Sequence, residues 1–379
     1  MQKIALLFLL VFVKAEAQTS AFTTADSLFA LGNYNKAINL YKQQQPETAY
    51  GLSKIGQAYN QLSAHHKAIP FFEKSIQKDS TLLITQYELA RLYTKTRAFT
   101  KADSLFKKLI VKDNTNPNFH YQLGRVQMIN KNGNYIASFK KAVAVDAYHL
   151  KSIKQLCKQF LKQKKWGLFD QYLNLGLQEY PENETLINYK AQGYFNRKQY
   201  EKAIPFFLKL YESSPKNKFV LFRLGLANHG LKNYTKALSF YELALKEDSK
   251  NGDYHLQMGK LYYDTNDMKN AAFQTMLATY YNKVALDKEW FQMGLIHKNK
   301  KDYKKAIGSF KKALKEQKKN YNAQFELAVC TDNYYKDDNV KLKQYNLYFW
   351  NFEGKNKRYD QIVAARISYF KTQLHLESK

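Results

Sequence analysis

Catalytic side-chain patterns are missing from this sequence. It has no Cys-x-x-Cys pair, no glycine-rich phosphate loop and no two histidines at helical metal-binding spacing. His65 and His66 are adjacent, so on a helix their side chains point about 100° apart and chelate poorly. Asp264 and Asp267 fall in a turn, where carboxylates are usually solvated. The sequence therefore predicts a protein that is not an enzyme and that uses no metal or cofactor.

Long hydrophobic runs are nearly absent as well. The one apolar run, Ile4 to Val13, has ten residues, whereas a membrane span needs about 20. Lys3 precedes this run, and the small-x-small sequence Ala-Glu-Ala at 15–17 follows it. This order is typical of a secretory signal peptide at residues 1–17, removed before Gln18. No cysteine lies near that site, which argues against a lipid anchor. We therefore expect an exported protein, periplasmic or secreted, without a membrane span.

Acidic residues are few compared with basic ones. The chain has 60 Lys and Arg against 32 Asp and Glu, a formal net charge of +28. Aromatic residues are abundant, with 30 Tyr and 25 Phe, so the chain can form a core and is not a disordered basic tail. The charge favours an anionic partner.

An internal repeat organises nearly the whole chain. Its clearest copy, residues 221–249, contains two short helical patterns joined at a Lys-Asn-Tyr turn. Alanine opens the second pattern of most copies, at Ala37, Ala68, Ala102, Ala203, Ala237, Ala271 and Ala306. Ile136 and Phe169 occupy the two intervening positions, so successive steps are 31 to 35 residues long. Repeats of this length predict a stacked array in which each unit packs on its neighbours.

Side-chain size recurs with the same period. A small residue lies twelve positions before each opening position: Ala25, Gly56, Ala90, Gly124, Cys157, Ala191, Gly225, Gly259 and Gly294. A large apolar residue follows four positions after it in most copies: Tyr41, Phe72, Phe106, Leu173, Phe207, Tyr241 and Phe310. Lys140 and Thr275 replace the large residue in two copies, which predicts tilted or loosely packed repeats there. The alternation of small and bulky residues predicts close packing of antiparallel helices.

These features resemble the tetratricopeptide repeat (TPR), a helix-turn-helix unit of about 34 residues. The resemblance implies an all-α fold, a right-handed α-α superhelix (TPR solenoid) with a C-terminal capping helix. We assign residues 18–335 to about nine to ten tandem repeats and residues 336–379 to a helical cap. A solenoid needs an atypical end unit to cover its last apolar face. The alternative for the cap is a helix that binds a partner.

The two cysteines, Cys157 and Cys330, lie about five repeats apart in this frame. A disulfide requires Cα atoms within about 7 Å, so the repeat frame excludes an internal bridge. Cys157 occupies the small-residue position of its repeat. We therefore expect two buried, apolar thiols without redox chemistry.

The resemblance implies that the first helix of each pair lines a concave groove that holds peptides or protein segments. Residues three before and one, four and five after the small residue should face this groove. In the N-terminal half they are basic or tyrosine: Tyr87, Arg91, Lys95, Tyr121, Arg125, Lys154, Lys158 and Lys162. Toward the C-terminus they become more apolar: Phe222, Leu226, Leu256, Tyr263, Phe291, Leu295, Phe325 and Val329.

The sequence thus predicts a scaffold or adaptor that binds a protein or peptide in its groove, in the cell envelope or outside the cell, and an acidic partner is one candidate. Arg and Lys in the groove can pair with carboxylates or phosphates. The alternative for these cations is an ordinary solvated surface. A different function is electrostatic binding of an anionic polymer, polysaccharide or nucleic acid, although predicted export makes nucleic acid a poor partner. TPR grooves that clamp a C-terminal carboxylate carry a Lys and an Asn one helical turn apart. Here Lys154 is followed by Lys158, so that role is not assigned.

Overall fold

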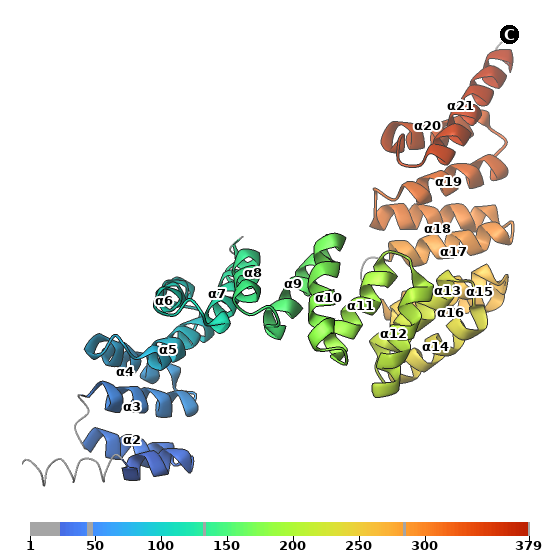
Figure 1. Cartoon of the computed structure of the whole chain (residues 1–379). Coiled ribbons are helices and arrows are strands. Elements are labelled where there is room, and N and C mark those ends of the chain that lie inside the picture. The colour runs from blue at the N-terminus through green and yellow to red at the C-terminus, as the bar shows by residue number, and fades with distance from the viewer. Residues whose placement is uncertain (1–22, 44–47, 132–133, 283–285, 378–379) are drawn as a thin grey trace, which may run out of the picture. The chain divides into compact units, whose positions relative to one another are not determined.

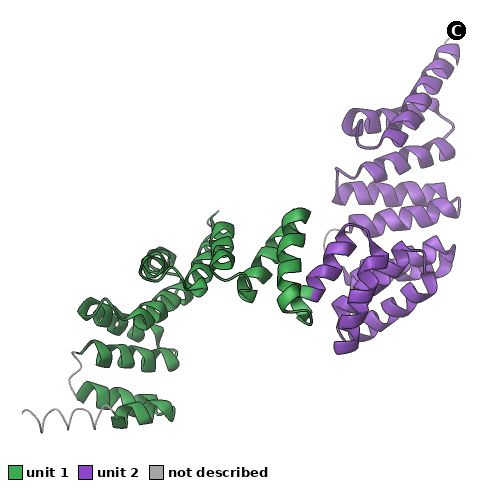
Figure 2. Cartoon of the chain, viewed as in Figure 1, with its two compact units in different colours: residues 1–186 green, residues 187–379 purple. Residues whose placement is uncertain are grey.

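Helices are the only regular elements in the part of the chain that the structure describes (Figure 1). The structure is a computed structural model, and it describes residues 23–43, 48–131, 134–282 and 286–377. The predicted signal peptide, residues 1–17, lies outside the described residues. The chain divides into two compact units, residues 1–186 and 187–379 (Figure 2).

The helices of unit 1 are α2 (Tyr34–Gln43), α3 (Ala49–Gln61), α4 (His65–Lys78), α5 (Leu83–Lys95), α6 (Phe99–Lys112), α7 (Pro117–Ile129), α8 (Tyr135–Val145), α9 (Leu150–Gln163) and α10 (Trp166–Glu179). The boundary between the units falls in the first turn of α11 (Glu184–Asn196). Unit 2 continues with α12 (Tyr200–Ser213), α13 (Lys218–Gly230), α14 (Tyr234–Glu247), α15 (Gly252–Asp264), α16 (Met268–Tyr281), α17 (Asp287–Asn299), α18 (Tyr303–Glu316), α19 (Tyr321–Tyr334), α20 (Asp338–Phe352) and α21 (Lys357–Glu377). Odd-numbered helices from α3 to α19 are the first of each repeat, and the following even-numbered helix is the second.

The turn inside each repeat has the same backbone conformation. A residue with positive φ, between 55° and 63°, precedes the second helix at Ser63, Arg97, Lys131, Lys164, Lys198, Lys232, Asn266 and Lys301. Gly32 takes this position in the first repeat, with φ 77°. Each of these residues lies five positions before the opening residue of its repeat, including Ile136 and Phe169. These turn positions agree with the repeat step found in the sequence. Ile136 is the exception among the opening residues, because it is only half-buried while the others are buried.

The expected interlock of small and bulky residues forms inside the repeats. A Cβ atom added to Gly225 would lie 2.5 Å from the Tyr241 ring, and one added to Gly294 would lie 2.5 Å from the Phe310 ring. Both rings are fully buried. Only glycine or another very small residue lets the paired helices approach this closely.

The prediction of loose packing in the repeat that contains Lys140 was wrong. Phe139, one residue earlier, is fully buried and its ring meets Gly124, so this repeat is closely packed. Thr275, the other exception, is also fully buried against Gly259, and its hydroxyl donates to the Ala271 carbonyl at 2.8 Å. Because this internal hydrogen bond satisfies the hydroxyl, a polar residue can occupy a core position.

The C-terminal helices α20 and α21 close the end of unit 2. Tyr345, Tyr348 and Phe352 of α20 pack with Val363 and Phe370 of α21 in one buried cluster. Phe325 and Ala328 of α19 belong to the same cluster. Elsewhere on α21, the side chain of Ile362 is exposed and that of Arg366 is half-buried.

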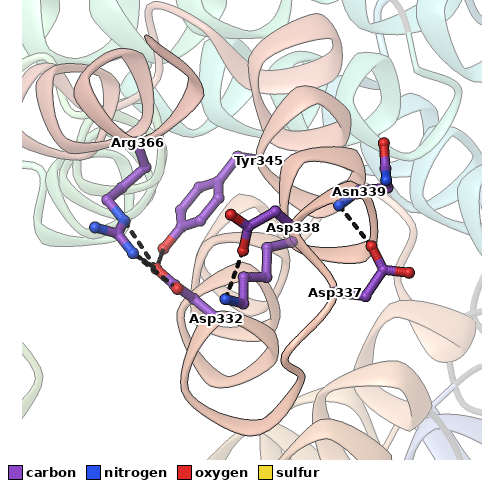
Figure 3. A network of polar contacts seen from close by, with 7 residues as sticks. Asp332, Asp337, Asp338, Asn339, Tyr345 and Arg366 are labelled. Carbon is purple, nitrogen blue, oxygen red and sulfur yellow. Dashed lines mark hydrogen bonds and ion pairs between the residues drawn. The ribbon is translucent and has the colours of Figure 1, made fainter. Parts of the chain in front are cut away.

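A polar network joins these end helices (Figure 3). Two guanidinium nitrogens of Arg366 donate to the two carboxylate oxygens of Asp332, each at 2.8 Å. The hydroxyl of Tyr345 donates to the same carboxylate at 3.0 Å. Because Asp332 lies on α19, Tyr345 on α20 and Arg366 on α21, the network holds the last three helices in one arrangement.

Candidate functional site

A cavity of about 610 Å³ in unit 1 is lined by α3, α5 and α7, the first helices of three successive repeats. Its walls are mostly polar: Asn60 and Gln61 on α3, Glu88, Arg91, Thr94 and Lys95 on α5, and Gln122, Arg125 and Ile129 on α7. Three residues predicted from the sequence to face the groove, Arg91, Lys95 and Arg125, are therefore brought together. A cavity of this size can hold a short stretch of peptide.

The two arginines of the cavity are presented in the same way. The guanidinium of Arg91 lies over the ring of Tyr87, 5.7 Å from its centroid, and Arg125 lies 5.9 Å from the centroid of Tyr121. In both pairs the tyrosine lies one helical turn before the arginine, and the two pairs are 34 residues apart. Stacking on a ring restricts an arginine while leaving its N–H groups available for an anion.

Hydrogen bonds connect the two repeats beneath these arginines. The Gln122 amide donates to the hydroxyl of Tyr87 at 3.2 Å, and Arg125 donates to the Gln122 carbonyl at 3.0 Å. The ring of Tyr87 also packs against Phe119 and Phe106, with centroids 5.7 and 6.1 Å away. Tyr87 therefore supports the cavity wall through its neighbours, although the sequence suggested only a groove-facing side chain.

One carboxyl group shares the cavity with these cations. Glu88 is half-buried, and its Oε2 is buried without a hydrogen-bond partner. Burial raises the pKa of this carboxyl, while its hydrogen bond with Gln57 and the charges of Arg91 and Lys54 oppose the rise. The cavity thus offers both guanidinium donors and a carboxyl acceptor, which suits a peptide with acidic side chains and backbone N–H groups.

The other predicted groove residues of unit 1 lie outside this cavity. Lys154, Lys158 and Lys162 are on α9, also a first helix. Lys158 and Lys162 are exposed and Lys154 is half-buried, and none of them lines the cavity. Their predicted role in binding a partner stays a prediction.

The predicted apolar half belongs to unit 2 and is partly filled by its own packing. Phe222 on α13 lies against Tyr254, with ring centroids 4.4 Å apart, and Phe291 on α17 lies 5.7 Å from Phe310. Leu226 and Tyr263 are likewise half-buried. Two further residues that the sequence predicted to face the groove lie in the core instead: Leu256 and Phe325 are only 1% and 6% exposed. Neither of these two presents a free surface to a ligand.

The positional rule used in the sequence analysis, which counts from the small residue of each repeat, missed several residues that line the cavity. Asn60 and Gln61 lie four and five positions after Gly56, so the same rule applied one repeat earlier finds them. Glu88 and Gln122 lie two positions before their small residue, a position that the rule does not include. Only the packing of neighbouring repeats shows that this position also borders the cavity.

Within the described ranges, no group of three or more His, Cys, Asp or Glu side chains is placed to hold a metal ion. None of the described helices is both long and apolar enough to cross a bilayer. Cys157 and Cys330 are free and fully buried, and burial raises the pKa of each thiol to about 12. The expectation of two buried thiols is thus confirmed.

Comparisons with known proteins agree with this architecture. Models of the tetratricopeptide repeat match residues 190–252 and 287–320. Among solved structures, a tetratricopeptide repeat protein from Parabacteroides merdae ATCC 43184 superposes with a TM-score of 0.51 at 15% identity, over 65% of this chain and 98% of that chain. Yeast Tom70 superposes with a TM-score of 0.49 at 12% identity, over 97% of this chain and 98% of that chain. A search of curated proteins finds no match.

The fold, the repeated turn and the family matches lead to one conclusion. Tandem helix pairs with a step of 31 to 35 residues run through both units, and two segments match the family directly. The chain is a tetratricopeptide repeat protein, built as an all-helical solenoid that ends in a C-terminal helix.

Proposed function

We propose that this protein is a non-catalytic scaffold that holds an acidic segment of a partner protein in the cavity formed by α3, α5 and α7. The observation that carries this proposal is the pair of stacked arginines, Arg91 and Arg125, presented by successive repeats to one cavity. TPR solenoids are generally protein-interaction scaffolds without catalysis, which supports the same assignment.

The geometry favours a peptide over a single small anion. Arg91 and Arg125 lie on different helices, so two acidic groups on one extended segment can pair with one arginine each. Glu88 and the amides Asn60, Gln61 and Gln122 offer hydrogen bonds to backbone groups between those two points. Lys95, one turn beyond Arg91, extends the positive wall.

The direct test measures binding of a fluorescein-labelled peptide of alternating Glu and Gly by fluorescence anisotropy. Arg91→Glu with Arg125→Glu should weaken binding at least about a hundredfold, because each charge-assisted hydrogen bond contributes roughly 1.5–3 kcal/mol. The matched control reverses Lys74 and Lys108, two exposed lysines on the second helices α4 and α6. Equal binding by the arginine variant and the control variant contradicts the proposal.

The alternative is electrostatic binding of an anionic polymer. A neutral Gln-Gly peptide and a salt series separate the two functions, because polymer binding falls steeply and uniformly as salt rises. A pull-down from the envelope fraction at low and then high salt applies the same criterion to natural ligands. Proteins retained at high salt support the scaffold, whereas anionic polymer lost at high salt supports the alternative.

We also propose export, which rests on the signal-peptide pattern of residues 1–17 alone. The test is N-terminal sequencing of the protein recovered from an envelope fraction. A mature chain that begins at Gln18 supports export, and an intact N-terminus in a cytoplasmic fraction contradicts it.

A further inference from the structure

Unit 2 presents three exposed apolar side chains on one of its second helices, α16. Phe273, Met276 and Tyr280 on α16 are 51%, 55% and 73% exposed. Their spacing of three and four residues places them along one face of the helix. Water-exposed side chains of this size on a single helix face are unusual for a surface that contacts only solvent.

The equivalent positions in the next repeats face the same side. The opening residues Ala271 and Ala306 are 35 positions apart, so Met276 and Tyr280 correspond to Lys311 and Lys315 on α18. Helices α16, α18 and α20 begin 35 residues apart, so Lys315 in turn corresponds to Trp350 on α20, which is 71% exposed. Helix α17 packs against both α16 and α18, and α19 packs against both α18 and α20. The three second helices therefore follow one another along unit 2, with one first helix packed between each pair.

Helix α18 supplies the positive charge of this side. Residues 300–319 contain nine lysines and two acidic residues. Lys304, Lys311 and Lys315 are exposed and make no ion pair with the described carboxylates. Lys312 lies over the ring of Trp290, 4.1 Å from its centroid, and Lys305 pairs with Asp302 at 3.0 Å. Most of this charge is thus available to an external anion.

We propose that this surface, the α16–α18–α20 face, binds peripherally to a bilayer of anionic lipids. We define the face by Phe273, Met276, Tyr280, Lys311, Lys315 and Trp350. Lysines near a negative leaflet gain Coulomb energy, while Phe, Met, Tyr and Trp side chains leave water for the headgroup region. A polysaccharide or nucleic acid neutralises the lysines but offers Phe273 and Met276 no comparable apolar environment. The combination of both side-chain classes therefore favours a lipid surface.

This inference is independent of the proposed peptide site. The cavity belongs to unit 1, and the α16–α18–α20 face belongs to unit 2. A scaffold with both surfaces would hold its protein partner close to a membrane without a spanning helix.

The test is flotation of the full-length chain with vesicles of phosphatidylglycerol and phosphatidylcholine, compared with phosphatidylcholine alone. The wild-type chain should float only with the anionic vesicles. Lys311→Glu with Lys315→Glu should lower the partition coefficient by about 25-fold, since each lysine near the leaflet contributes about a fivefold factor. The control reverses Lys74 and Lys108, which are exposed on second helices of unit 1, and this control variant should bind the vesicles almost as well as the wild-type chain.

A second pair of variants separates a bilayer from other anionic partners. Phe273→Ser with Met276→Ser should lower vesicle binding about tenfold or more, yet leave binding to heparin or DNA unchanged. In vesicles that contain brominated lipid, fluorescence of the wild-type chain should be quenched, and Trp350→Phe should remove most of that quenching. Equal binding to both vesicle types overturns the proposal, as does equal loss in the two lysine variants. Vesicle binding that ignores the Ser substitutions also overturns it, in favour of a general polyanion surface.

Discussion

The ring of Tyr359 lies flat on the ring of Phe325, with centroids 3.8 Å apart and planes within 1° of parallel. Tyr359 belongs to α21, the last helix of the chain. Phe325 belongs to α19, the first helix of the final helix pair. This contact explains why Phe325 is buried, although the sequence predicted that its position in the repeat faces the groove. The cap covers the apolar residue that a following repeat would otherwise cover.

Loss of this contact should destabilise unit 2. Tyr359→Ala removes the stacked ring and opens the buried cluster of the cap, so we expect a loss of about 2–3 kcal/mol in the free energy of unfolding. Urea denaturation followed by circular dichroism measures it. Tyr359→Phe keeps the ring and should change stability by less than about 0.5 kcal/mol. Similar losses in both variants would mean that the hydroxyl, and not the stacking, is responsible.

The glycine positions make a matched pair for the close packing inside repeats. An added Cβ at Gly225 meets the Tyr241 ring at 2.5 Å, whereas one at Gly308 meets nothing within 4 Å. Gly225→Ala should therefore cost about 1–3 kcal/mol through overpacking. Gly308→Ala should stabilise α18 by up to about 1 kcal/mol, because alanine favours a helix interior. Thermal and urea unfolding measure both, and a neutral Gly225→Ala contradicts the assigned interlock.

The turn inside each repeat stores a small strain. Lys232 has φ 63°, a left-handed conformation that costs a non-glycine residue roughly 1–2 kcal/mol. Lys232→Gly should raise stability by about 0.5 kcal/mol after the larger entropy of unfolded glycine is included. Lys236→Gly, four residues later inside α14, should instead cost about 1 kcal/mol. Equal effects in urea unfolding would show that the turn carries no strain.

The carboxyl of Glu88 should make stability depend on pH. Burial raises its pKa above the ordinary 4.5, so the folded chain binds this proton more tightly than the unfolded chain. The contribution is therefore complete below pH 4.5 and is lost as pH rises through the folded pKa. Glu88→Gln should flatten this part of the stability profile. At neutral pH it should raise the free energy of unfolding by about 1 kcal/mol, because the neutral amide avoids the cost of burying a charge. Urea unfolding between acidic and neutral pH measures the slope, and an unchanged slope contradicts the prediction.

The two thiols should report on the two units separately. Cys157 lies in unit 1 and Cys330 in unit 2, and burial raises the pKa of both to about 12. Both should react with iodoacetamide at least about a hundredfold more slowly in the native chain than in urea, because only an exposed thiolate is reactive. Mass spectrometry of each peptide over time measures the two rates. Rapid native labelling of either thiol would contradict its burial.

Much of the fold was predictable because it depends on local periodicity. The small residue, the bulky residue and the step of about 34 positions are all visible in the sequence, and they specify which helices pair and which faces meet. Phe139 shows the limit: it fills the core place expected for Lys140. A one-residue change within a turn shifts a side chain around the helix, and periodicity alone does not show which residue then reaches the core.

The candidate site was less predictable because it is made by three helices from different repeats. The sequence by itself determined that Arg91 and Arg125 occupy equivalent positions, since a fixed step places equivalent residues on one side of a solenoid. Only the tertiary structure decided that Glu88 and Gln122 join them around one cavity and that Phe325 is lost to the core beneath Tyr359. Burial depends on what a neighbouring helix brings to the same point, and that is a property of packing and not of spacing along the chain.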